Sequence, residues 1–208
     1  LAVLVILLSP RKLSEASIRA FGLAIIGSML NSWTVMGYLG IIENNQYNTA
    51  IVVPDGKGGR HLILNRTNSS MYNDNGHKHV YIEFLERQLI DPIRDADPPK
   101  DILVIGAGGF TFGLEDRVNH YEFVDIDGSL KKVAEDYVLK QKLTPNKIFH
   151  VAEARAFLAG TKKQYDVIVL DAYQGDLTMP EHLATREFYK QVKDHLKTLQ
   201  WLFESRSC

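Results

Sequence analysis

One stretch of the sequence, residues 101–127, limits the folds open to this chain more than any other. Residues 102–105 form an apolar run typical of a parallel strand that is covered on both faces. A Gly-Ala-Gly-Gly turn follows at residues 106–109, and we expect a helix after it whose N-terminus faces a ligand. A second strand then ends in two acids, Asp125 and Asp127. The stretch therefore predicts half of a nucleoside-binding α/β domain.

The spacing within this stretch indicates the kind of nucleoside. Asp125 lies 19 residues after Gly106, near the distance at which a carboxylate on the second strand can bind a ribose diol. The dinucleotide fingerprint needs a third small residue three positions after the second glycine, where this chain has Thr111. The pattern fits S-adenosylmethionine or a related nucleoside better than NAD. The alternative is a glycine turn that only packs a helix on a sheet.

The composition argues against several other classes of protein. A formal net charge of −1 over 208 residues gives no electrostatic reason to expect nucleic acid as a partner. Cys208 is the only cysteine, so neither a disulfide framework nor a CxxC metal site is expected. His77 and His79 have no acid or cysteine beside them, so we interpret them as surface residues and expect no metal.

Residues 1–40 are mostly apolar and predict one or more membrane segments. Residues 1–8 are too few to span a bilayer, which takes about 20 residues, but they fit the end of a longer helix. Residues 18–39 are long enough for a span, and Trp33 and Tyr38 resemble an interfacial aromatic belt. A soluble helix packed on the domain is the alternative. Because the chain begins with leucine inside an apolar run, we expect a fragment or a missing start.

The basic residues Arg11, Lys12 and Arg19 bear on the orientation of such a segment. They would stay cytoplasmic and send the following domain outside the cell. A cytosolic nucleoside requires the opposite orientation. We expect a membrane-associated protein whose nucleoside-binding domain is cytoplasmic.

Residues 41–90 predict a small antiparallel β module followed by a helix. A strand at 41–43 precedes a hairpin, whose strands at 51–53 and 61–64 flank a glycine-rich turn at 55–59. A helix is expected over 77–90, with its apolar face formed by Val80, Phe84, Leu85 and Leu89. The proline-bearing segment 91–99 indicates a boundary between this small β module and the α/β core that follows.

Residues 98–208 predict a Rossmann-like domain that is truncated or altered at its C-terminus. Strands at 148–151 and 165–170 alternate with helices at 128–142, 156–158 and 183–196, which is typical of an α/β doubly wound parallel sheet. Gly106, Asp125, Glu153 and Asp171 all follow strands, so we expect them together at the carboxyl edge of the sheet.

Six motifs follow one another along residues 43–197: Tyr47-Asn48, the Gly-Ala-Gly-Gly turn, Val124-Asp125-Ile126-Asp127, Glu153-Ala154-Arg155, the run from Asp166 to Asp171, and the run from Pro180 to Tyr189. In their order and spacing they resemble the spermidine synthase family, the polyamine aminopropyltransferases, including relatives fused behind membrane helices. This resemblance implies an S-adenosylmethionine or decarboxylated S-adenosylmethionine co-substrate, no metal, and a small-molecule amine acceptor. A homodimer is also expected.

The resemblance implies a role for each matching residue. Asn48 would touch the nucleoside, Asp125 the ribose diol and Glu153 the adenine amino group. Asp171 would be the catalytic acid that positions and deprotonates the attacking amine. The residues expected on the nucleoside side are Asn48, Gly106, Ala107, Gly108, Asp125, Ile126, Glu153 and Ala154, and those expected on the acceptor side are Tyr81, Tyr173 and Gln174.

Four positions depart from the family pattern. Gly109 and Gln174 stand where the family usually has aspartate, Ser69 where it has glutamine, and Gly58 where it has tyrosine. Losing two carboxylates should weaken binding of a diamine by roughly 1.5–3 kcal/mol per charged hydrogen bond. Residues 198–208 do not match the family, so the sheet is expected to lack its last strands.

Three functions remain open on the sequence. The first is aminopropyl transfer from decarboxylated S-adenosylmethionine to a polyamine such as putrescine. The second is methyl transfer from S-adenosylmethionine to an unknown acceptor. The third is a non-catalytic nucleoside-binding or membrane-attached regulatory domain. Family membership favours the first, whereas the missing carboxylates favour the other two.

Overall fold

A computed structural model describes residues 15–30, 32–172, 179–197 and 202–204 of the chain. The chain forms two compact units, Leu1–Ile41 and Ile42–Cys208. The first unit contains α2 (Glu15–Leu30) and α3 (Trp33–Tyr38), so the apolar stretch expected as one helix over residues 18–39 is interrupted. Ser32 begins α3 by accepting a hydrogen bond from the Val35 amide at 3.4 Å.

This interruption leaves α2 with 16 residues, fewer than the roughly 20 that a bilayer requires. No helix among the described residues combines the length and the apolar character that crossing a membrane requires. The membrane segment predicted over residues 18–39 is therefore not supported. Residues 1–8, the other candidate, lie outside the described part of the chain.

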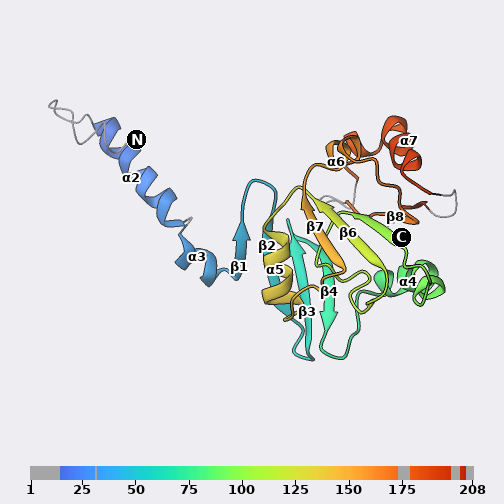
Figure 1. The fold of residues 1–208 in the computed structure, drawn as a ribbon. Coiled ribbons are helices and arrows are strands. Elements are labelled where there is room, and N and C mark those ends of the chain that lie inside the picture. Colours follow the sequence, from blue (N-terminus) through green and yellow to red (C-terminus); the bar gives the residue numbers. More distant parts are fainter. Residues whose placement is uncertain (1–14, 31, 173–178, 198–201, 205–208) are drawn as a thin grey trace. The chain divides into compact units, whose positions relative to one another are not determined.

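The second unit begins with a four-stranded sheet in the order β1-β2-β3-β4 (Figure 1). The predicted hairpin is confirmed: β2 and β3 are antiparallel, and the Asp55 carboxylate accepts hydrogen bonds from Lys57 and Gly59 in the turn. The fourth strand was not expected. The strands are β1 (Ile41–Asn44), β2 (Thr49–Pro54), β3 (Gly59–Leu64) and β4 (Thr67–Asn73).

The helix α4 (Val80–Leu89) follows this sheet and ends in a short 3-10 turn at Asp91–Ile93. Its predicted apolar face is partly wrong. Ile82, Leu85 and Leu89 are buried, but Val80 is 73% exposed and Phe84 is 48% exposed. Leu85 and Leu89 were expected on this face, and Ile82 takes the place of Val80 and Phe84 because it lies three residues before Leu85 on the side of the helix that packs on the core.

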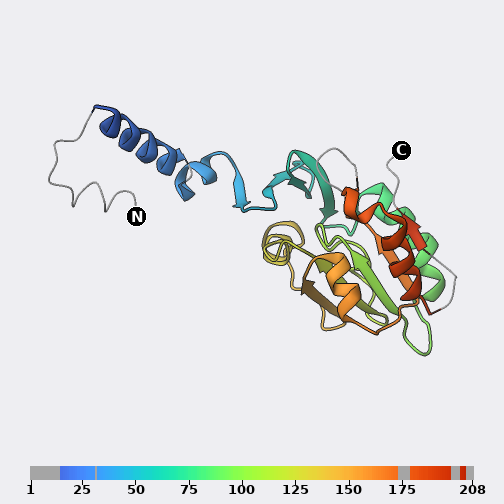
Figure 2. The ribbon, with the colours of Figure 1, turned by 90° about the horizontal axis from the view of Figure 1, so that it is seen from above.

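A five-stranded sheet in the order β7-β6-β5-β8-β9 forms the rest of the unit, with every neighbouring pair parallel. It confirms the predicted doubly wound α/β fold, and Figure 2 shows it beside the small sheet. Residues 202–204 provide a fifth strand, so the sheet does not stop at β8 as expected. The strands are β5 (Asp101–Ile105), β6 (His120–Asp125), β7 (Lys147–Val151), β8 (Val167–Leu170) and β9 (Leu202–Glu204).

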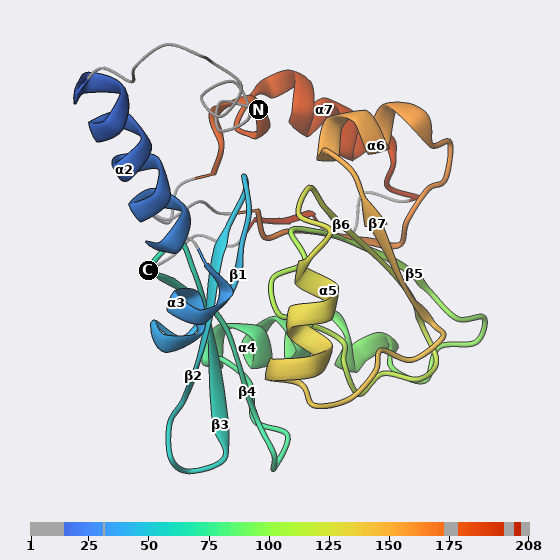
Figure 3. The ribbon, with the colours of Figure 1, turned by 90° about the vertical axis from the view of Figure 1, so that its left-hand side faces the viewer.

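Alternate residues of β5 enter two hydrophobic clusters on opposite faces of the sheet. Leu103 and Ile105 pack on one face with α6 (Ala154–Gly160) and α7 (Arg186–Asp194) (Figure 3). Ile102 and Val104 pack on the other with α4 and α5 (Leu130–Val133). This burial of both faces explains the continuous apolar run of the strand.

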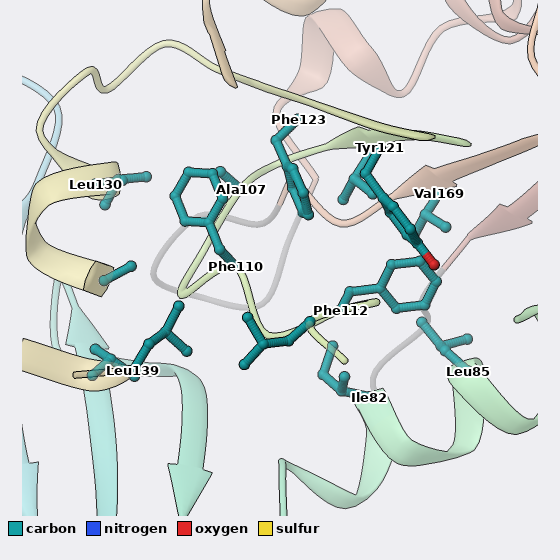
Figure 4. Close-up of a cluster of buried hydrophobic side chains, with 14 of the residues drawn as sticks. Ile82, Leu85, Ala107, Phe110, Phe112, Tyr121, Phe123, Leu130, Leu139 and Val169 are labelled. Atoms are coloured by element: carbon teal, nitrogen blue, oxygen red, sulfur yellow. The ribbon is translucent and has the colours of Figure 1, made fainter. Parts of the chain in front are cut away.

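The helix predicted directly after the glycine turn is absent, and residues 106–119 form a succession of turns. Phe110 has a left-handed φ of 55° and Gly113 one of 65°, which a helix does not allow. Phe110 and Phe112 instead point into the hydrophobic cluster that contains Ile102 and Val104 (Figure 4). The Glu86 carboxylate of α4 accepts a hydrogen bond from the Gly113 amide at 2.6 Å. The N-terminus expected to face a ligand is therefore replaced by a packed loop.

The other predicted helices are present with different lengths: α6 extends beyond the predicted residues 156–158 at both ends, and the other two are shorter than expected. The segment 128–142 contains α5, which continues as a π-helix over Ala134–Val138. The segment 183–196 contains α7, preceded by a 3-10 turn at Glu181–Leu183. The predicted division of this unit into residues 41–90 and 98–208 stays a prediction.

Candidate active site

The glycine turn after β5 lies directly against the end of β8. Gly106 has φ 93°, and its amide donates a hydrogen bond to the Val124 carbonyl at 2.9 Å. A Cβ atom at this position would lie 2.4 Å from the Asp171 carbonyl oxygen. Only glycine permits this approach, so Gly106 brings the ends of β5 and β8 together. Ala107 follows and is buried.

Asp125, at the end of β6, holds the same turn. One carboxylate oxygen accepts a hydrogen bond from the Ala107 amide at 2.9 Å, and the other accepts one from the Asp127 amide at 3.0 Å. Burial raises the pKa of the Asp125 carboxyl, and these backbone hydrogen bonds only partly offset that effect. Each oxygen keeps a lone pair that could receive a ribose hydroxyl. Ile126, the next residue, is 43% exposed.

Asn48 is joined to this region through Asp127. Its side-chain amide donates to an Asp127 carboxylate oxygen at 2.8 Å, and its own oxygen accepts from the Asn65 amide at 2.9 Å. Asp127 is 1% exposed and also accepts hydrogen bonds from the side chains of Asn45 and Ser129. The contact of Asn48 with a nucleoside stays a prediction, and its amide group has two protein partners. Sequence reasoning missed Asp127 as the link between the small sheet and β6.

Glu153 follows β7 and caps α6. Its carboxylate accepts hydrogen bonds from the amides of Arg155 at 3.0 Å and Ala156 at 2.8 Å. The His182 imidazole lies 3.6 Å from one of its oxygens. Ala154 is buried beneath it. A carboxylate held in this way has a fixed direction, which suits recognition of an exocyclic amino group.

Asp171 follows β8 and contacts α4. Its amide donates to the Ile105 carbonyl at 2.7 Å, and one carboxylate oxygen accepts a hydrogen bond from the Tyr81 hydroxyl at 2.9 Å. The structure thus brings together two residues that the sequence assigned to the acceptor side. The other two, Tyr173 and Gln174, lie outside the described residues.

Ser70 of β4 is a residue of this site that sequence reasoning missed. Its hydroxyl accepts a hydrogen bond from the Gly109 amide at 2.8 Å. A Cβ atom on Gly109 would lie 2.7 Å from the Ser70 Cβ, and one on Gly108 would lie 3.3 Å from the Ser69 hydroxyl. No motif predicted this contact because β4 itself was not predicted.

The strand order fixes how these groups follow one another. The strands β7, β6, β5 and β8 are neighbours in that order, and their carboxyl ends carry Glu153, Asp125, Gly106 and Asp171, respectively. Since all these strands are parallel, the four residues lie in the same sequence along one edge. The arrangement can receive an elongated ligand whose parts meet these residues in turn.

Comparisons with known proteins identify the family to which the chain is similar. Residues 88–199, more than half of the chain, match the family model described as the spermine/spermidine synthase domain. A polyamine aminopropyltransferase from Vibrio vulnificus is 34% identical over 140 residues, which are 64% of this chain and 46% of that protein. A probable polyamine aminopropyl transferase from Bifidobacterium longum is 30% identical over 105 residues, 49% of this chain and 23% of that protein. The chain thus spans less than half the length of these two curated relatives.

Solved structures show the same fold. A probable spermidine synthase from Corynebacterium glutamicum superposes with a TM-score of 0.63 at 19% identity, covering 74% of this chain and 59% of that one. A spermidine synthase in complex with the transition state analogue AdoDATO gives a TM-score of 0.55 at 21% identity, covering 76% and 55%. Together with the match over residues 88–199, the fold and the order of the site residues establish that the chain belongs to the spermine/spermidine synthase family.

Proposed function

We propose that this domain transfers an aminopropyl group from decarboxylated S-adenosylmethionine to a small amine such as putrescine. The observation that carries the proposal is the order of Glu153, Asp125, Gly106 and Asp171 along one edge of the sheet. Adenine, ribose, sulfonium and amine occur in that same order in the reacting pair. Family membership supports the proposal.

The reaction needs a neutral amine in line with the carbon that leaves the sulfonium. The amine nitrogen attacks this carbon, a carbon–nitrogen bond forms, the carbon–sulfur bond breaks, and methylthioadenosine leaves as a neutral thioether. The amine proton passes to the Asp171 carboxylate, which Tyr81 orients through its hydroxyl. The sulfonium supplies its own leaving group, so the transfer itself requires no metal.

The test is an assay of the purified chain with decarboxylated S-adenosylmethionine and putrescine, with spermidine and methylthioadenosine detected by mass spectrometry. Asp171→Asn should lower turnover about 100-fold or more, the size typical of a lost general base, and change the affinity for methylthioadenosine less than threefold. Tyr81→Phe, which keeps the carboxylate, should have a smaller effect. Full turnover by Asp171→Asn would show that its assigned role is wrong.

The alternative is methyl transfer from S-adenosylmethionine, and Gly109 is the observation that favours it. This position lacks the carboxylate that would select a decarboxylated donor. In the same assay, a methylated amine formed from S-adenosylmethionine, without aminopropyl product from the decarboxylated donor, would replace the first proposal. Nucleoside binding without either product would indicate the non-catalytic function.

We also propose that residues 1–40 attach the protein to a membrane, with the nucleoside-binding domain on the cytoplasmic side. In α2, Leu23, Ile26 and Met29 are more than half exposed, and its one described ion pair, Arg19–Glu15, lies in the first turn. Co-sedimentation of the chain with phosphatidylcholine vesicles tests this, and Leu23→Lys/Met29→Lys should reduce it. A homodimer stays a prediction, which sedimentation velocity would test.

A further inference from the structure

Asp127 is a buried acid to which the proposed reaction gives no role. It follows Asp125 by two residues, is 1% exposed, and its carboxylate accepts four hydrogen bonds within the described part of the chain. The donors are the side-chain amides of Asn45 at 2.9 Å and Asn48 at 2.8 Å, and the backbone amide and hydroxyl of Ser129 at 3.0 and 2.6 Å. Because burying a carboxylate is costly unless its oxygens are hydrogen-bonded, these contacts are what allow an acid at this position.

Two of these donors belong to the turn between β1 and β2. The Asn45 side-chain oxygen accepts hydrogen bonds from the backbone amides of Tyr47 at 2.8 Å and Asn48 at 3.0 Å. The Asn45 backbone amide in turn donates to the Asn48 carbonyl at 3.0 Å. The turn is therefore folded around the Asn45 side chain, a common use of asparagine in turns. Since the side-chain amides of Asn45 and Asn48 both donate to Asp127, this acid holds the turn of the small sheet on the end of β6.

The same contacts bear on the direction of the Asp125 carboxylate. One of its oxygens accepts the Asp127 backbone amide at 3.0 Å, and the other accepts the Ala107 amide at 2.9 Å. Where the Asp127 amide lies depends on where its side chain is held. If that side chain lost its partners, the turn after β6 would be less ordered, and one of the two hydrogen bonds that orient Asp125 would weaken. This step rests on the proposed function, in which Asp125 binds the ribose.

We propose that Asp127 is a positioning residue of the nucleoside site: by joining the turn between β1 and β2 to the turn after β6, it holds Asp125 in the direction that the ribose hydroxyls require. The role needs a group that only accepts hydrogen bonds. Asparagine has the same size, but one of its two terminal atoms is a donor, and it would face the amide of either Asn45 or Asn48. The small sheet thus contributes to nucleoside affinity through Asp127.

Asp127→Asn is the first test, measured on the full chain at a temperature where circular dichroism shows it folded. Calorimetry with methylthioadenosine, which carries only the nucleoside part of the donor, should show affinity lowered about tenfold or more, because the site is no longer preorganised. In the transferase assay, KM for decarboxylated S-adenosylmethionine should rise by a similar factor, whereas kcat and KM for putrescine should change less than about threefold. A purely structural role would lower kcat through loss of folded protein and leave both KM values unchanged. That result, or unchanged affinity, would overturn the inference.

Asn45→Ala tests whether the effect passes through the turn between β1 and β2. Asn45 has no proposed contact with the nucleoside, yet its loss should lower affinity for methylthioadenosine about threefold or more, because Asp127 loses a donor and the turn loses its centre. Combined with Asp127→Asn it should add little, so that the double variant binds within about twofold of Asp127→Asn alone. No loss in Asn45→Ala, or losses that add in full, would contradict the coupling.

Asn65→Gly is the matched control on the opposite side of Asn48. The Asn65 side chain is exposed and donates to the Asn48 side-chain oxygen at 2.9 Å, and its φ of 49° is one that glycine adopts freely. Because water can replace this contact, affinity should change less than about threefold. A loss as large as that of Asp127→Asn would contradict the specific role of Asp127.

Calorimetry also separates this inference from the proposed function. If wild type binds methylthioadenosine and the three variants behave as expected, but no aminopropyl product forms, the inference stands and the proposed function fails. If wild type binds no nucleoside, both fail.

Discussion

The two ends of the five-stranded sheet carry acids in opposite electrostatic settings. At the amino end, Asp101 contacts Lys163 at 2.9 Å and Lys197 at 2.7 Å, and these lysines also contact Glu122 and Asp166. At the carboxyl end, the hydrogen bonds to Asp125 and Glu153 come from backbone amides. Within the described residues, no lysine or arginine forms an ion pair with either of them.

The pKa directions express this contrast. Burial alone would raise the pKa of Asp101, but hydrogen bonds from Lys197 and Lys163 outweigh it and hold the pKa below its usual value. For Asp125 burial prevails and the pKa is raised. Acids matched by cations inside the fold contribute to stability, whereas the buried Asp125 has no cation beside it in the described part of the chain, so a cationic ligand would favour its charged form. The carboxyl end is thus the end suited to bind a cationic sulfonium nucleoside.

A pair of alanine substitutions, one at each end of the five-stranded sheet, tests this functional difference most directly. Asp125→Ala should abolish nucleoside binding, because it removes about two charged hydrogen bonds to the ribose, worth roughly 1.5–3 kcal/mol each. That corresponds to a loss of about 100-fold or more in affinity for methylthioadenosine, measured by calorimetry. The substitution also removes the hydrogen-bond acceptor of the Ala107 amide, and the less ordered glycine turn should weaken nucleoside binding further.

Asp166→Ala is the control for that experiment at the opposite end. Asp166 accepts a hydrogen bond from the Asp101 amide and contacts Lys197 at 2.8 Å, so its loss should lower the thermal midpoint. Its effect on affinity should stay below threefold. Should Asp125→Ala bind methylthioadenosine as tightly as Asp166→Ala does, the functional distinction between the two ends would not hold.

The parts of the site that strands position could be predicted from the sequence. Residues 102–105 and 167–170 are continuous apolar runs, because both of their faces are covered, and each run is followed by a residue of the site. The chain reads β5, β6, β7, β8, and the usual doubly wound order then places Gly106, Asp125 and Asp171 at one edge. The assignment of those residues rests on this order.

The parts that depend on side-chain packing could not be predicted. The residues of β4 are mostly polar and show no strand pattern. The segment forms a strand because it pairs with β3, which its own propensity does not predict. Ser70 could therefore not be placed beside Gly109. Likewise, the helix expected after the glycine turn is replaced because Asp116 accepts hydrogen bonds from the amides of Val118 and Asn119, which fold the loop locally.

Asp101→Asn should have a smaller effect, confined to stability. Because the folded pKa of Asp101 lies below the unfolded value of 3.8, its contribution is present above that value and is lost as the pH falls through the folded pKa. Both lysines are partly exposed, so the loss should be about 1 kcal/mol. Urea unfolding should be measured at about pH 6, 4.5 and 3. The difference in unfolding free energy between wild type and variant should be the same at the first two pH values and smaller at the third. A difference that does not change at low pH would contradict the ion-pair origin.

Lys147→Met should give an effect of about the same size or smaller, in a higher pH range, and here too the stability of the wild type rises with pH. Lys147 is 4% exposed, donates to the Asp116 carbonyl at 2.6 Å and lies 5.0 Å from the centre of the Tyr121 ring; burial lowers its pKa to about 8. As the pH rises through 8 the folded protein releases this proton, whereas the unfolded chain keeps it until about 10.5, so folding becomes more favourable over that interval. Relative to the methionine variant, wild type should gain about 1 kcal/mol of unfolding free energy between roughly pH 7 and 9, or less where solvent screens the charge. Tyr121 does not interfere, because burial and its hydrogen bond to Asp116 raise its pKa beyond this range. A gain of the same size in Lys147→Met and none in Asp125→Ala would place the titrating group at the carboxyl end and contradict the assignment to Lys147.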